Sequence, residues 1–244
     1  MALGHSRPIE GAVATLGVSE RVTFLRRTYA VLGIGLLAWA GLTFYIFRFM
    51  PEFSFKLSSW ALSGRWNWAI VLGAFMVLNM IAQALARSEA SRPIQYVGLA
   101  VAVIAESLIL QPLITVLFWK FPSGNAINIL TAASIITMLI FGGLTLTVFL
   151  TKKDFSFMRG FLTIATFAAM GVIIASLIFG FQLGAIFCGA MILLMAGYIL
   201  YQTSLVMQHY PPTHYVSAAL MLFSTVATLF WYVLQFIMEM SSNR

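Results

Sequence analysis

Hydrophobic positions gather into seven long runs, and short polar segments separate them. Each run is close to the roughly 20 residues that a helix needs to cross the hydrocarbon core of a bilayer. A segment in lipid must satisfy its own backbone hydrogen bonds, so all seven runs are predicted to be helices. The predicted spans are residues 29–49, 66–86, 94–118, 127–150, 160–180, 183–208 and 214–238.

This pattern predicts an all-α integral membrane protein with one membrane domain, residues 29–238, between a polar cytoplasmic N-terminal tail (1–28) and a short C-terminal tail (239–244). The first run is longer than the apolar region of a cleavable signal, about 7–15 residues, so we expect it to be a retained helix. Pro112 falls inside the third run and predicts a kink there.

Composition supports a protein that folds in lipid. The chain is 61% hydrophobic and 9% charged, whereas soluble domains carry about 25% charged residues. The formal charge of +7 comes from bases in the short segments between apolar runs. No cluster of bases and aromatics suggests nucleic-acid binding. The predicted partner of most of the surface is therefore the lipid bilayer.

The Lys and Arg residues divide unevenly between the two sides of the predicted bundle. With a cytoplasmic N-terminus, nine lie on the inner side and five on the outer side, which favours this orientation. Short loops and the lack of an organelle signal favour the cytoplasmic (inner) membrane of a bacterium. The inner set is Arg7, Arg21, Arg26, Arg27, Arg87, Arg92, Lys152, Lys153 and Arg159, and the outer set is Arg48, Lys56, Arg65, Lys120 and Arg244.

Small residues are expected where helices approach closely, because no hydrophobic force draws helices together in lipid. The predicted positions are Gly33, Gly35, Gly41, Gly142, Gly143, Gly171, Gly184, Gly189 and Gly197.

One acid lies deep in a predicted span. Glu106 sits near the middle of "VAVIAESLILQPLI", where a carboxylate costs roughly 2.5–3.5 kcal/mol on insertion scales. We expect it to face the bundle interior, either in an ion or proton path or as a structural hydrogen-bonding acid. The other acids lie in tails, loops or helix ends: Glu10, Glu20, Glu52, Glu89, Asp154 and Glu239.

No base lies deep in a span to pair with Glu106, so its predicted partners are neutral polar groups. A stripe on the last helix has spacings of four, three and four, which place its members on one face. Such hydroxyls act either as bonds between helices or as the lining of an ion path. The candidates are Asn79, Gln83, Gln202, Ser204, and the stripe Ser217, Met221, Ser224 and Thr228, with Thr225 beside it.

Enzyme chemistry finds little support. All four lysines lie in loops, so no Schiff-base lysine is available within a span. Only three histidines exist, and no serine has a histidine and an acid arranged near it in sequence, as nucleophilic catalysis requires. We therefore predict no catalytic residue, no metal site and no cofactor.

The loop "LTKKDFSFMRGFL", residues 150–162, resembles the "FTKKDFSFLGGFL"-type loop of the Bax inhibitor family, whose members carry the transmembrane Bax inhibitor motif. Its matching residues are Lys152, Lys153, Asp154, Phe155 and Ser156. Asp154 is expected to cap the short turn that follows it. The segments "GYILYQTS" and "YVSAALMLFSTVATLFWY" also resemble the family's sixth and seventh helices, and the resemblance extends over nearly the whole chain.

This resemblance implies a seven-helix fold in which the last helix is central and wrapped by the other six. It also implies a pH-sensitive leak for calcium or other cations, with suppression of cell death in eukaryotes and modulation of membrane-protein quality control in bacteria. The family's gate is a pair of aspartates that share a proton. Here those positions are Gln202 and Thr225, and the family's asparagine aligns with Thr228, so the pair cannot titrate.

The resemblance leaves two functions open. The first is a cation (calcium) leak with altered or absent pH gating, with Glu106, Gln202, Thr225, Thr228 and Ser224 as candidates for the ion path or gate. The second is a non-conducting membrane protein that regulates a membrane protease or a stress response by binding partners.

Overall fold

The computed structural model describes residues 17–88 and 92–242, and all regular structure within them is helical. Seven of the helices are long and apolar enough to cross a membrane, which confirms the predicted fold class. The helices are α1 (Val18–Phe49), α2 (Pro51–Leu62), α3 (Arg65–Ala86), α4 (Arg92–Lys120), α5 (Ser123–Thr151), the 3₁₀ turn η2 (Ser156–Met158), α6 (Arg159–Phe179), α7 (Ala185–Gln208) and α8 (Tyr215–Ser242).

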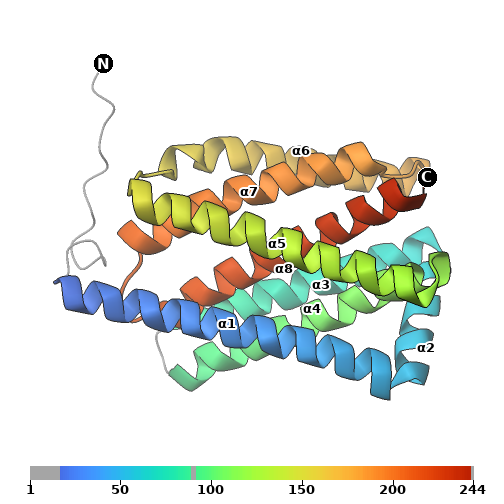
Figure 1. Cartoon of the computed structure of the whole chain (residues 1–244), viewed down its shortest axis with the longest axis horizontal. Helices are drawn as coiled ribbons and strands as arrows, with labels where there is room; N and C mark the ends of the chain where they lie inside the picture. The colour runs from blue at the N-terminus through green and yellow to red at the C-terminus, as the bar shows by residue number, and fades with distance from the viewer. Residues whose placement is uncertain (1–16, 89–91, 243–244) are drawn as a thin grey trace.

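The seven long helices run side by side, and the start of α1 and the end of α8 lie at opposite ends of the bundle (Figure 1). Helix α8 packs against α1, α3, α4, α5 and α7. The centre is shared, however, because α4 is the most deeply buried span and α8 is the next. Helix α6 is the least buried span and packs mainly against α7. The last helix is therefore central together with α4, and α6 forms an outer layer.

Helix α1 differs most from its predicted bounds, and three stretches lie outside the described residues. Helix α1 begins at Val18, well before the predicted start of the first span, and α8 continues to Ser242. Helices extend beyond the apolar run because hydrogen bonding continues into the polar flanks, where water can solvate the side chains. The predictions that concern Arg7, Glu10, Glu89 and Arg244 fall outside the described residues.

Helix α2 is an eighth helix that the apolar runs did not predict. Its 12 residues reach roughly 18 Å at 1.5 Å per residue, which is too short to span a bilayer. It begins with Pro51, a residue whose fixed φ suits the first helical position. Figure 1 shows α2 lying across one end of the bundle rather than along it.

Buried polar side chains fasten α2 to α4. The Ser54 hydroxyl donates to Gln111 Oε1 at 2.9 Å, and the Thr115 hydroxyl donates to Ser58 Oγ at 2.9 Å. Gln111 also donates to the carbonyl oxygens of Thr43 at 3.3 Å and Ser107 at 3.1 Å. Because Gln111 is fully buried, these bonds satisfy an amide that lipid could not solvate.

The tightest contact between helices at a glycine occurs outside the predicted set. A Cβ built on Gly98 of α4 would lie 2.6 Å from the Ala82 carbonyl oxygen and 2.8 Å from the Ala86 nitrogen of α3. Among the predicted glycines, Gly197 is the most tightly packed, with Leu162 Cδ2 at 2.9 Å. The prediction was wrong for the following glycines, which have open space where a Cβ would stand: Gly33, Gly41, Gly142, Gly143, Gly171 and Gly184.

Candidate functional site

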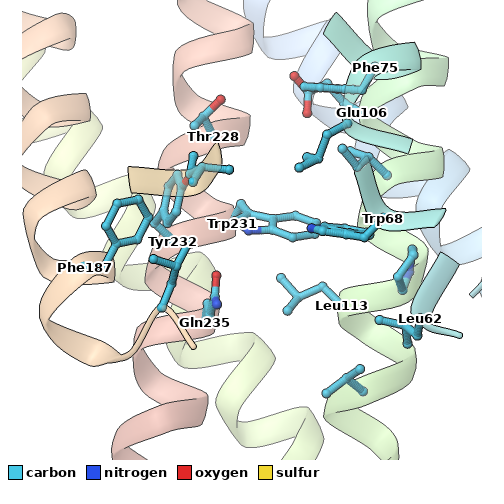
Figure 2. Close-up of a pocket in the computed structure, with 16 residues that line it drawn as sticks. Leu62, Trp68, Phe75, Glu106, Leu113, Phe187, Thr228, Trp231, Tyr232 and Gln235 are labelled. Carbon is cyan, nitrogen blue, oxygen red and sulfur yellow. The ribbon is translucent and has the colours of Figure 1, made fainter. Parts of the chain in front are cut away.

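A cavity of about 360 Å³ lies between α3, α4, α6, α7 and α8. It extends from Glu106, midway along α4, to Leu62 and Leu183 at the end of the bundle where α2 lies. Figure 2 shows the Glu106 carboxyl group together with Thr228 at one end of this space. Most of the remaining wall is aliphatic or aromatic. The cavity therefore places one acid in surroundings that offer it little solvation.

Glu106 is only 5% exposed and faces the interior, as its position in the sequence predicted. Within the described residues, its carboxyl group makes no hydrogen bond and no ion pair. Of its predicted neutral partners, only Thr228 lines the same cavity, and the Thr228 hydroxyl donates to the Ser224 carbonyl oxygen at 2.8 Å instead. Asn79 donates to Phe75 within its own helix. Packing thus brings Glu106 to a cavity rather than to a hydrogen-bonding partner.

Two indole rings cross the cavity beside Glu106. Trp68 of α3 and Trp231 of α8 stack with their ring centroids 6.0 Å apart and their planes 22° apart. In Figure 2 the rings are seen nearly edge-on, with Glu106 on one side and Leu113, Leu62 and Gln235 on the other. Neither tryptophan was a candidate from the sequence.

Gln202 and Thr225 meet between α7 and α8. The Thr225 hydroxyl donates to Gln202 Oε1 at 2.8 Å and also approaches the Met221 carbonyl oxygen at 3.2 Å. Both side chains are buried. They form a neutral bond between the two helices. The Glu106 cavity does not include either residue, although Thr228 lies about one helical turn from Thr225.

Of the two remaining hydroxyls of the α8 stripe, one has a hydrogen-bonding partner and the other has none within the described residues. Ser217 Oγ lies 3.2 Å from the Tyr210 hydroxyl. Ser224 Oγ is buried without a hydrogen-bonding partner, and it is not among the residues that line the Glu106 cavity. The stripe therefore contributes one residue, Thr228, to the surroundings of Glu106.

The loop after α5 is fixed to α7. Asp154 Oδ1 accepts a hydrogen bond from the Ser156 nitrogen at 2.8 Å, which confirms the predicted cap. The Phe155 nitrogen donates to Ser204 Oγ of α7 at 3.1 Å. Lys152 ends α5 in the left-handed conformation with φ 51°, and Lys153 is exposed beside it.

A second cavity, of about 480 Å³, adjoins this loop at the opposite end of the bundle from α2. Its lining includes Ser156, Arg159, Tyr201 and His209. Gln202 follows Tyr201 directly in α7, so the Gln202–Thr225 bond lies next to this cavity, although neither residue lines it or the Glu106 cavity. The two cavities are separate.

These features define a seven-span membrane protein with a buried acid in an apolar cavity and a neutral polar pair on its last two helices. A family model described as "Inhibitor of apoptosis-promoting Bax1" matches residues 21–243. The chain therefore belongs to the Bax inhibitor family.

Individual relatives agree with this assignment. The chain is 30% identical to Bax inhibitor 1 of Schizosaccharomyces pombe over 236 residues, which covers 95% of this chain and 82% of the yeast protein. It is 27% identical to protein lifeguard 4 of Mus musculus, over 92% of this chain and 88% of the mouse protein. An uncharacterised protein of Pseudomonas aeruginosa is 36% identical over 49% of this chain and 53% of its own length. No solved structure gives a significant match.

Proposed function

We propose that the protein is a cation leak whose path includes the Glu106 cavity and whose barrier is the Gln202–Thr225 pair. The observation that supports this proposal is the Glu106 carboxyl group, which is 5% exposed and makes no hydrogen bond within the described residues. An intramembrane acid is costly and most often marks an ion or proton pathway. A carboxyl group that faces a cavity is available to a passing cation.

The barrier follows from the chemistry of the neutral pair. The family resemblance implies two aspartates at these positions, and two carboxyl groups in one site share a proton. Gln202 and Thr225 bond to each other at 2.8 Å and carry no proton that pH can remove in the physiological range. They also offer calcium no carboxylate oxygen, the ligand it prefers. We therefore propose a leak for calcium and other cations without the family's pH gating at this point.

The proposed setting is the cytoplasmic membrane of a bacterium, with the N-terminus on the cytoplasmic side. The Lys and Arg distribution supports this orientation. The Glu106 cavity then extends to the outer end of the bundle, and the loop with Lys152 and Lys153 lies inside.

Flux into liposomes that contain the purified protein tests the proposal. Calcium and potassium flux are compared for the wild type, Glu106→Gln and a matched Glu52→Gln control, whose carboxyl group lies in the exposed first turn of α2. We expect flux above empty liposomes for the wild type and the control, and a marked loss in Glu106→Gln. No flux from folded wild-type protein would exclude the leak.

A second candidate function is a non-conducting membrane protein that regulates a protease or a stress pathway by binding a partner. The observation that favours it is the direct Gln202–Thr225 bond, since it joins two buried side chains of α7 and α8 to each other and neither of them lines a cavity. Absence of flux in the liposome experiment would leave this function as the better one.

A further inference from the structure

The chemistry of the Glu106 cavity is unusual for a site that only passes inorganic ions. One acid, Glu106, faces a space whose aliphatic walls also carry several aromatic rings, including Trp68, Trp231, Tyr232 and Phe187 (Figure 2). No Lys, Arg or His is among the lining residues that the structure describes. The cavity therefore combines one potential negative charge with several electron-rich ring faces, and its described lining carries no competing positive charge.

Inorganic calcium fits these walls poorly. In proteins, calcium is coordinated by about six to eight oxygen ligands at 2.3–2.6 Å. Among the described lining residues, side-chain oxygen atoms come from Glu106, Thr228, Tyr232 and Gln235, and in Figure 2 Gln235 lies on the far side of the indole pair from Glu106. Calcium would keep much of its water here, which agrees with passage rather than tight binding.

An organic ammonium ion fits the walls of the Glu106 cavity better than calcium does. Alkylated ammonium groups are bound over the faces of tryptophan and tyrosine, and quaternary ammonium ligands are recognised by cages of such rings. The stacked pair of Trp68 and Trp231 supplies a broad aromatic surface from α3 and α8, and Glu106 from α4 supplies the counter-charge. The volume of about 360 Å³ is within the usual range for small-molecule sites.

We propose that this cavity is a binding site for a small organic ammonium cation, held between the Glu106 carboxylate and the faces of Trp68 and Trp231. The proposal goes beyond the leak and does not depend on it, because it concerns equilibrium binding. A bound ammonium ion would give Glu106 the partner that it lacks within the described residues.

Choline tests the site, and its neutral isostere 3,3-dimethylbutan-1-ol is the comparison, because the two differ mainly in charge. Binding is measured by isothermal titration calorimetry on full-length protein in a maltoside detergent, which carries no ammonium group. We expect choline to bind one site per chain and the alcohol to bind at least about tenfold more weakly. This comparison uses the wild type only, so it does not depend on the folding of a variant.

Variants then identify the residues involved. We expect Glu106→Gln to abolish measurable choline binding and Trp231→Leu to weaken it by about 2- to 30-fold, the range of a cation–π contact. Two matched controls should bind as the wild type does: Glu52→Gln on α2, and Trp66→Leu, which alters a tryptophan on α3 that is 77% exposed.

Three results would overturn the proposal. They are equal binding of choline and the neutral alcohol, unchanged choline binding in folded Glu106→Gln, and no binding of choline to folded wild-type protein. Loss of flux in liposomes would not bear on it, so failure of the leak and failure of this site are distinguishable.

Discussion

The Thr225 hydroxyl of α8 donates a 2.8 Å hydrogen bond to Gln202 Oε1 of α7, and both residues are buried. The family resemblance implies a proton-sharing pair of aspartates at these two positions. The two side chains still bond α7 to α8, but neither of them carries a charge.

Restoring aspartates at both positions should introduce pH-dependent flux. In the double variant Gln202→Asp with Thr225→Asp, two carboxyl groups share one site and release a shared proton as pH rises. We expect cation flux into liposomes to change between about pH 5 and 8, whereas wild-type flux through this pair should not. The control carries asparagine at both positions, which has the size of aspartate without its charge. Equal pH profiles for the two double variants would contradict the prediction.

The Gln202–Thr225 bond should have a measurable coupling energy. We expect a double-mutant cycle with Gln202→Leu and Thr225→Val to give about 0.6 to 2 kcal/mol, the range found for hydrogen bonds between membrane helices. The measurement is the free energy of unfolding in mixed micelles. In a control cycle, Thr228→Val replaces Thr225→Val and should give almost no coupling, because Thr228 bonds within α8. Coupling of similar size in both cycles would show that the bond is not its source.

Replacing Glu106 by leucine should stabilise the fold. Its carboxyl group is buried without a hydrogen bond in the described residues, and a buried polar group of this kind costs about 1–3 kcal/mol. A gain of that size raises the melting temperature by roughly 2–4 °C per kcal/mol in a chain of this length. The thermal unfolding of the two proteins in detergent measures this difference.

The matched control for Glu106→Leu is Gln111→Leu on the same helix. Gln111 accepts from Ser54 and donates to the Thr43 carbonyl oxygen, so its loss leaves these groups without partners. We expect the melting temperature to fall in Gln111→Leu. A fall of equal size in both variants would show that Glu106 has a structural partner after all.

Gly98→Ala should loosen the contact between α3 and α4. The new Cβ would lie 2.6 Å from the Ala82 carbonyl oxygen, and backbone atoms cannot move aside as a flexible side chain can. Overpacking of this kind costs about 1–3 kcal/mol, so we expect a lower melting temperature. Gly73→Ala on α3 is the control, since a Cβ there meets nothing within 4 Å. A control variant as unstable as Gly98→Ala would argue against steric overlap.

Local rules predicted the parts of the structure that depend on the chain alone. The seven spans followed from the length of the apolar runs, because each helix in lipid satisfies its own backbone. The cap of Asp154 on Ser156 followed from a bond between neighbours in sequence. The inward direction of Glu106 followed from the cost of exposing an acid to lipid.

Packing between helices determined which groups each buried polar side chain contacts. The sequence showed that Glu106 needs an interior, but only the placement of α3 and α8 set the Trp68–Trp231 pair beside it and left Thr228 bonded elsewhere. Helix α2 was missed because its buried face consists of Ser54, Ser58 and Ala61, which give no apolar signal. The amino-acid sequence thus determined which segments cross the membrane and which residue is costly there. The tertiary structure decided what that residue meets, because the rotation and close approach of helices depend on side chains that are far apart along the chain.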